Sequence, residues 1–270
     1  TSGITASGVL GGTYGLNSIG GTVAPDIIGM VRVDQAWGLF QASFAAHDNH
    51  AAYNGATEVT GHPEDKWGWA AQLALSIKNI PTGPGDTLNI QGVFTDGASR
   101  YNFQSLANTS YAMYGGSNFA YQSIGFAGVA DAVFAPGRGL STVQTWGMRG
   151  GYTHNWDPHW NTALYGAYAQ VRYGSTGSAL VCAGIAASGV LSAGSTCNPD
   201  FNLGQIGLIT RWTPVKNLTF SADVTYSHLD QKFSGTAIAP TVASVAKPAA
   251  TYELKDQDTV SLLLRAQRNW

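Results

Sequence analysis

The chain contains the stretch DTVSLLLRAQRNW, residues 258–270, in which apolar and polar side chains alternate. One parity carries Val260, Leu262, Leu264, Ala266 and Trp270, and the other carries Ser261, Leu263, Arg265, Gln267 and Asn269. A period of two predicts a β-strand with two different faces. An apolar face that ends in an aromatic side chain is typical of a strand that faces lipid, although an edge strand of a soluble β-sandwich would alternate in the same way.

The composition favours the membrane interpretation. Charged residues make up 11% of the 270 residues, about half of what a soluble globular protein carries, yet the mean hydropathy is −0.04. The polarity therefore comes from neutral side chains, as expected of a sheet with one face in lipid and one in water. No apolar run approaches the roughly 18 residues of a membrane helix. The net charge of −2 gives no basic footprint for nucleic acid.

Similar alternation recurs along the chain and is clearest in residues 67–78, where Trp67, Trp69, Leu73 and Ile77 oppose Gln72 and Lys78. We expect nine spanning strands, at residues 27–34, 39–46, 67–78, 86–95, 142–154, 160–173, 203–212, 218–228 and 258–270. Residues 1–25 are expected to form a loop. Residues 121–134 are apolar enough to be a strand, but a strand there would invert all later ones, so residues 96–141 are assigned to one external excursion into the channel mouth.

The connections are of two kinds. Those near Gln35, Pro81, Pro158 and Pro214 are short, and those that begin near His47, Asp96, Gly174 and Asp230 are long. This layout predicts an all-β fold, a transmembrane antiparallel β-barrel with short periplasmic turns and long external loops. Five tryptophans lie beside short turns or at the final position, and we expect them to form one interfacial belt: Trp37, Trp156, Trp160, Trp212 and Trp270.

The number of expected strands has a consequence for domain organisation. Nine is odd, whereas single-chain bacterial barrels close with an even number. We therefore expect residues 1–270 to be the C-terminal part of a single barrel domain that further strands upstream of Thr1 complete.

Three segments resemble the general porins of alphaproteobacteria: DIIGMVRVDQAWG (residues 26–38), WDPHWNTALYGAY (residues 156–168) and the final QRNW (residues 267–270). The resemblance implies a sixteen-stranded, trimeric barrel in the outer membrane of a Gram-negative bacterium. Such a barrel contacts lipid and lipopolysaccharide, needs no cofactor, and passes small hydrophilic solutes passively. The family usually ends in Phe where Trp270 stands, and its N-terminal strands and constriction loop have no counterpart here.

Strand parity also predicts which side chains line the pore, because an aqueous lumen tolerates charge that lipid does not. The residues predicted to face the lumen are Arg149 and Arg265 near mid-strand, Arg32 and Arg211 near the periplasmic rim, Arg172 near the outer rim, and Gln72, Asn89, Gln91 and Asp223. The arginines would form a basic strip that gives a mild ion preference, or would merely solvate the lumen wall. Arg268 has the lipid-side parity close to the end of its strand, where it can snorkel.

Cys182 and Cys197 lie in one Gly/Ser-rich segment and predict a disulfide, with two free thiols as the alternative. A polar segment holds His47, Asp48, His50, His62, Glu64 and Asp65. This mixed spacing is weak evidence for a metal, and a solvated loop is preferred.

Two other functions compete with the channel. One is an adhesin whose long loops are the functional part. The other is an outer-membrane hydrolase, for which His228, Asp230 and Asp48 are the only candidate group, with neither a nucleophile elbow nor a zinc-ligand spacing beside them.

Overall fold

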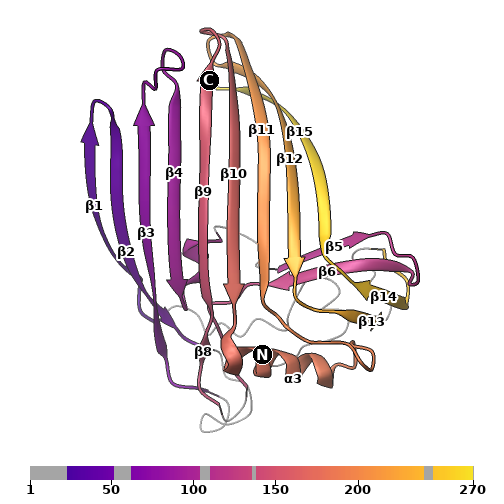
Figure 1. Ribbon diagram of the computed structural model, residues 1–270. Helices are drawn as coiled ribbons and strands as arrows, with labels where there is room; N and C mark the ends of the chain where they lie inside the picture. The colour runs from indigo at the N-terminus through magenta and orange to yellow at the C-terminus, as the bar shows by residue number, and fades with distance from the viewer. Residues whose placement is uncertain (1–22, 52–61, 104–109, 136–137, 240–245, 270) are drawn as a thin grey trace.

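The computed structural model describes residues 23–51, 62–103, 110–135, 138–239 and 246–269. A nine-stranded antiparallel sheet dominates it (Figure 1). Its strands are β1 (Ile27–Gln35), β2 (Gly38–Asn49), β3 (Lys66–Lys78), β4 (Thr87–Asp96), β9 (Gln144–Asn155), β10 (Trp160–Arg172), β11 (Phe201–Val215), β12 (Leu218–Gln231) and β15 (Gln257–Arg268). The nine predicted spanning strands are confirmed. The loop predicted for residues 1–25 and the side chain of Trp270 lie largely outside the described residues.

The strands follow one another in the order β1-β2-β3-β4-β9-β10-β11-β12-β15. Strand β4 pairs directly with β9, so the described residues between 97 and 143 add no strand to this sheet. The sheet curves, and β1 and β15 form its two edges among the described strands (Figure 1).

Four short turns lie at one end of the sheet, which we call the turn end; it is uppermost in Figure 1. They are residues 36–37, 79–86, 156–159 and 216–217. In the last of them Asn217 has φ 68°, a left-handed conformation that asparagine tolerates better than most residues. The long connections lie at the opposite end, the loop end, so the predicted division between short and long links is confirmed.

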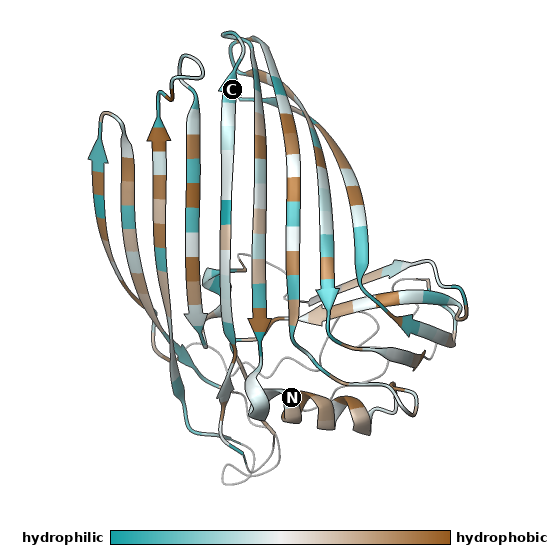
Figure 2. Ribbon diagram, in the orientation of Figure 1, coloured by the Kyte–Doolittle hydropathy of each residue, from teal (hydrophilic) through white to brown (hydrophobic). Residues whose placement is uncertain are grey.

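The two faces of the sheet differ in polarity. Cross-strand register aligns Phe40 with Leu75 and Leu164 with Leu208, and the strands alternate in hydropathy along their length (Figure 2). Apolar side chains on this apolar face stay exposed: Leu73 is 58%, Leu164 51% and Leu262 63% exposed. A broad exposed apolar surface of this kind indicates contact with something other than water.

The long connections build a second layer at the loop end. Strands β5 (Ser110–Gly115), β6 (Gln122–Gly128), β13 (Gly235–Ala239) and β14 (Ala250–Leu254) form a four-stranded sheet in the order β13-β14-β6-β5. Beside it lie the pair β7 (Ala132–Val133) and β8 (Ser141–Thr142), the 3-10 helix η1 (Ser99–Tyr101) and the helix α3 (Gly174–Ala187) (Figure 1).

This loop-end layer has its own hydrophobic core. Phe126 of β6 and Ile185 of α3 are fully buried in one cluster with Val171, Phe201 and Leu229, which come from the loop ends of β10, β11 and β12. The layer therefore packs on the face opposite the apolar one. The described part of the excursion of residues 96–141 is confirmed as non-spanning, but it is more ordered than the sequence predicted, because β6 pairs with β14 on one side and with β5 on the other.

Helix α3 was not predicted. Its Cys182 forms a disulfide with Cys197, with Cα atoms 5.8 Å apart, so the predicted pairing is confirmed. Among the described residues, no helix has both the length and the apolarity needed to cross a bilayer.

Candidate functional site: the polar face of the sheet

The face opposite the apolar one, which we call the polar face, carries eight of the fourteen charged side chains of the nine strands. The other six have the apolar-face parity and lie at strand ends: Asp48, Asp96, Arg172, Asp230, Asp258 and Arg268. Register places eight of the nine residues predicted to line the pore on it: Arg32, Gln72, Asn89, Gln91, Arg149, Arg211, Asp223 and Arg265. Lys66 and Lys78 share this face, and Asp34 and Asp223 are the acidic side chains on it. Cations therefore outnumber carboxylates there.

A continuous polar row crosses the sheet obliquely, from near the turn end of β1 to near the loop end of β15. Consecutive cross-strand partners run Arg32, Gln41, Ala74, Gln91, Arg149, Ala167, Gln205, Ser227 and Thr259. Every member is polar or is alanine, so this row carries no large apolar side chain. Arg32 and Arg149 belong to the same row although they lie at different distances from the ends of their strands.

Arg149 lies on the polar face next to the residues that follow η1. It lines a cavity of about 260 Å³ together with Asn102 and Phe103, which follow η1, and with Gln205 of β11. Its Nη2 atom is buried and has no hydrogen-bond partner among the described residues. A guanidinium nitrogen without an acceptor, in a cavity with room for several water molecules, is suited to water or an anion.

The residues that follow η1 can approach Arg149 because the residues of β9 on which they pack are small. A Cβ on Gly147 would come within 2.5 Å of the Asn102 side chain, so only glycine permits this approach. The Asn102 amide donates to Thr145 Oγ1 at 3.0 Å. The Thr145 and Thr95 hydroxyls are 2.7 Å apart in turn. Small and hydroxyl-bearing side chains thus seat η1 against the polar face.

The other arginines differ in their surroundings. The Arg32 guanidinium contacts the Asp34 carboxylate at 2.7 Å, and both side chains are about half exposed. Arg211 Nη1 donates to Asn161 Oδ1 at 3.2 Å. Arg211 and Arg265 flank Ser221 in a second row. Because β15 ends at Arg268, Arg265 lies closer to the turn end than the mid-strand position that we expected.

Arg172 is not on the polar face, so its predicted place in the lumen is wrong. It is the cross-strand partner of Gln144. Gln170 and Tyr168 lie on the same side of β10 as Arg172, and the partner of Gln170 is Trp146 of β9, on the apolar face. Both parities of β10 carry apolar residues, so alternation alone could not assign its faces.

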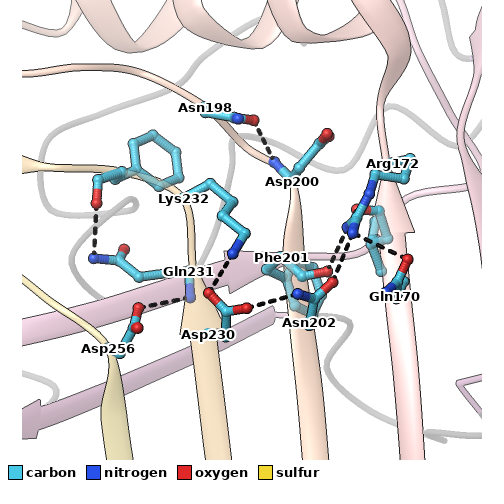
Figure 3. Close-up of polar contacts among 12 residues, drawn as sticks. Gln170, Arg172, Asn198, Asp200, Phe201, Asn202, Asp230, Gln231, Lys232 and Asp256 are labelled. Carbon is cyan, nitrogen blue, oxygen red and sulfur yellow. Dashed lines mark hydrogen bonds and ion pairs between the residues drawn. The ribbon is translucent and has the colours of Figure 1, made fainter.

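At the loop end of the apolar face Arg172 is part of a polar cluster (Figure 3). Its Nη2 donates to Gln170 Oε1 at 3.0 Å and to Asn202 Oδ1 at 2.8 Å. The Asn202 amide donates to Asp230, which also holds Lys232. These contacts form a polar rim at the loop-end edge of the apolar band.

The four described tryptophans of the predicted belt lie at the turn end. Trp160 stacks on Trp212 with ring centroids 5.6 Å apart, and Trp212 stacks on Phe220 at 5.7 Å. Trp37 and Trp156 are exposed beside them in the turns.

A second aromatic group lies toward the loop end and was missed as a belt. Trp69 contacts Phe94 at 5.3 Å and Phe44 at 6.2 Å, and Trp146 contacts Tyr168 at 5.6 Å. The signal was present in the sequence, since Trp67 and Trp69 open the clearest alternating stretch. Two girdles that flank an apolar band are typical of a transmembrane barrel.

The polar residues of the β2–β3 connection separate in the structure. The His47 ring lies 2.7 Å from Asp26, and the Tyr101 hydroxyl donates to the same carboxylate at 2.5 Å. His50, His62 and Asp65 instead form a group of their own, with ligand atoms within 4.8 Å of one another.

The Asp26 contacts fix η1 to the start of β1. Burial opposes ionisation of Asp26, but the hydrogen bonds from Tyr101 and His47 outweigh it, so the pKa of the Asp26 carboxyl is lowered. Burial and the neighbouring Asp26 raise the pKa of Tyr101 to about 12.

The candidate hydrolase group does not assemble. Asp48 lies on β2, and His228 and Asp230 lie on β12, with five strands between them in the sheet. His228 contacts Asp258 at 2.7 Å, and Asp230 contacts Lys232 and Asn202. The described residues therefore do not bring these three side chains together.

An exposed apolar band between two aromatic girdles, backed by a polar face, defines an outer-membrane β-barrel protein. The chain matches the family described as "Porin subfamily" over residues 3–263 and belongs to that family. Membership places it in the outer membrane of a Gram-negative bacterium. The narrower resemblance to alphaproteobacterial general porins stays a prediction.

No curated protein matches the chain in sequence. Among solved structures it is similar to the outer membrane channel DcaP of Acinetobacter baumannii, with 11% identity and a TM-score of 0.47. The similarity covers 94% of this chain and 57% of that channel, so the chain spans little more than half of the channel's length.

Proposed function

We propose that this chain forms part of the wall of a water-filled channel through which small hydrophilic solutes and ions diffuse passively. The observation that carries the proposal is the contrast between the faces. The apolar face exposes residues such as Leu73, Leu164 and Leu262, whereas the polar face carries a continuous row of polar and small side chains. Lipid on one side and water on the other satisfy both faces at once.

The excess of cations on the polar face supports a mild preference for anions. Arg149 contributes most to it, because one of its buried guanidinium nitrogens has no partner among the described residues and the field of a charge is strongest where low-dielectric walls surround it. Arg265 and Arg211 act in the same sense near the turn end. Arg32 contributes less, because Asp34 neutralises it.

The nine strands form part of a larger barrel in this proposal. Both edge strands, β1 and β15, have one neighbour each among the described strands, and edge strands with unpaired backbone groups are not stable in lipid. Further strands would close the barrel, sixteen in all by the resemblance, and three such barrels would associate as a homotrimer with lipopolysaccharide around them.

Single-channel recording in planar bilayers tests the proposal. The complete barrel that contains this chain is expected to give ohmic steps in the nanosiemens range, and a salt gradient should give a reversal potential of the sign expected for anion preference. Arg149→Gln should reduce that potential, whereas the matched variant Arg268→Gln, on the apolar-face parity, should leave it unchanged. Absence of steps from correctly folded protein would contradict the channel.

One observation favours a second candidate, a surface-binding barrel. The loop-end layer has a buried core and a disulfide of its own, as a domain that presents a binding surface would. Such a barrel would insert into bilayers without conducting, so the same recordings separate the two functions.

A further inference from the structure

We propose that His50, His62 and Asp65 form a binding site for one transition-metal ion, best suited to Zn²⁺, at the loop end of the β2–β3 pair. The ligand atoms of these three side chains all lie within 4.8 Å of one another. Two imidazoles and one carboxylate are a donor set that zinc accepts, with water in the fourth position.

Two of the ligands are held by the sheet. His50 directly follows β2, and Asp65 directly precedes β3, just beyond the last paired residues Asn49 and Lys66. The His50 Nδ1 and Asp65 Oδ1 atoms are 2.7 Å apart. The antiparallel ladder thus places a histidine and a carboxylate opposite each other, in the way that cross-strand neighbours meet.

The third ligand comes from the same short segment as Asp65. His62 lies three residues before it, with Pro63 between them limiting the backbone. The His62 and His50 rings have centroids 4.9 Å apart and are inclined at 57°, so they do not stack face to face. Inclined rings direct their nitrogens toward a shared point more readily than stacked rings do.

Only small movements of the three side chains are needed to bring their ligand atoms to the spacing that a metal requires. Ligand atoms on one tetrahedral zinc, each about 2.0–2.1 Å from it, lie about 3.4 Å apart. The present spread of up to 4.8 Å closes by side-chain rotation, since His50 and His62 are partly exposed and Asp65 is exposed. The ammonium of the adjacent Lys66 donates to the carbonyl of Leu140 at 3.3 Å, outside the group of three ligands.

Other histidine–carboxylate pairs show what is particular to this group. His228 lies 2.7 Å from Asp258 and His154 lies 2.7 Å from Asp86, but within the described part of the chain only His50 and Asp65 have a second imidazole beside them. A single pair is satisfied by its hydrogen bond alone. A third donor converts such a pair into a chelating site.

Metal titration of the full chain, folded in detergent and freed of metal by dialysis against chelator, tests the proposal. Zn²⁺ is expected to bind at one equivalent by calorimetry, and Mg²⁺ or Ca²⁺ in excess should not displace it, because those ions prefer oxygen ligands. Co²⁺ in the same site should give the visible absorption bands of tetrahedral coordination.

The variants His50→Ala and His62→Gln should each weaken Zn²⁺ binding by at least about tenfold and abolish the Co²⁺ bands. His228→Ala is the matched control, since it removes an imidazole from a pair without a third ligand, and it should bind as the parent does. Binding below one equivalent would overturn the proposal, as would binding that both variants retain. Single-channel conductance of the same variants is expected to be unchanged, so failure of the metal site is distinguishable from failure of the channel.

Discussion

The Tyr165 hydroxyl donates a hydrogen bond to Asp223 Oδ1 at 2.6 Å, from β10 across β11 to β12. The ring lies directly over Gly207, where a Cβ would come within 2.3 Å of the Tyr165 ring carbon Cζ. Glycine is therefore required at position 207 for the tyrosine to lie flat on the polar face. This contact ties three strands together on the side that we assign to water.

Gly207→Ala should displace the Tyr165 ring and break its hydrogen bond to Asp223. Since hydrogen bonds to charged groups contribute about 1.5–3 kcal/mol, we expect the free energy of unfolding in detergent to fall by a similar amount. Tyr165→Phe should give a comparable loss. Gly204→Ala on the same strand is the control, because its nearest neighbour would be 3.9 Å away; equal effects at 204 and 207 would refute the explanation.

Asp86 makes the turn between β3 and β4 sensitive to pH. Its carboxylate is fully buried, which by itself disfavours the charge, but it accepts hydrogen bonds from Thr82, the Asn155 backbone and Tyr152 and contacts His154. Together these contacts hold its pKa well below the usual range.

A pKa that is lower in the folded chain means that the unfolded chain binds the proton more tightly. The stabilisation by Asp86 is therefore complete at neutral pH and is lost as the pH falls below about 4. Thermal unfolding measured from pH 7 to pH 3 should show this loss, and Asp86→Asn should reduce it while lowering the neutral-pH midpoint. Glu64→Gln, at an exposed carboxyl, should change neither; a full acid loss in Asp86→Asn would contradict the assignment.

The disulfide should stabilise the loop-end layer without being needed by the spanning sheet. It closes a 15-residue separation, for which chain entropy predicts about 3 kcal/mol. Replacing Cys182 and Cys197 by serine should expose residues 188–196 to protease, while strand content measured by circular dichroism stays close to that of the parent. Collapse of the strand signal would show that the layer is essential to the sheet.

Lipid exposure makes the apolar face intolerant of charge. Ile90→Arg places a cation on it, where arginine near the bilayer midplane costs roughly 2–4 kcal/mol. Asn89→Arg, one residue earlier on β4 and on the opposite face, should fold into lipid vesicles almost as the parent does. Urea titrations of vesicle-inserted protein provide the comparison, and equal losses in the two variants would count against two unlike faces.

The spanning strands could be predicted because each faces lipid on one side and water on the other, so polar and apolar side chains alternate along the strand. The loop-end layer could not be predicted in this way, because β6 and α3 are buried by protein on several sides and their polar and apolar residues do not alternate. The search for apolar runs looked only for a membrane helix of roughly 18 residues, whereas the shorter α3 buries Val181 and Ile185 in a local core.

The residues of the candidate functional site were likewise predicted only in part. Arg149 was assigned to the correct face because Trp146 and Met148 fix the parity of β9. Arg172 was misassigned because both faces of β10 carry apolar side chains, such as Tyr165 and Val171 on one and Leu164 on the other. The meeting of His50, His62 and Asp65 depends on the pairing of β2 with β3, which residue spacing alone does not reveal.

The most direct test of the two-faced sheet is the solvent contact of adjacent positions on one strand. Spin labels at Ile90→Cys and Asn89→Cys in reconstituted protein should differ in collision with oxygen, which dissolves in lipid, and with a water-soluble nickel chelate. We predict that the label at position 90 collides with oxygen and is shielded from nickel, and that the label at position 89 does the reverse. A label at position 90 that is shielded from both reagents, as it would be under a second protein layer, would contradict the account.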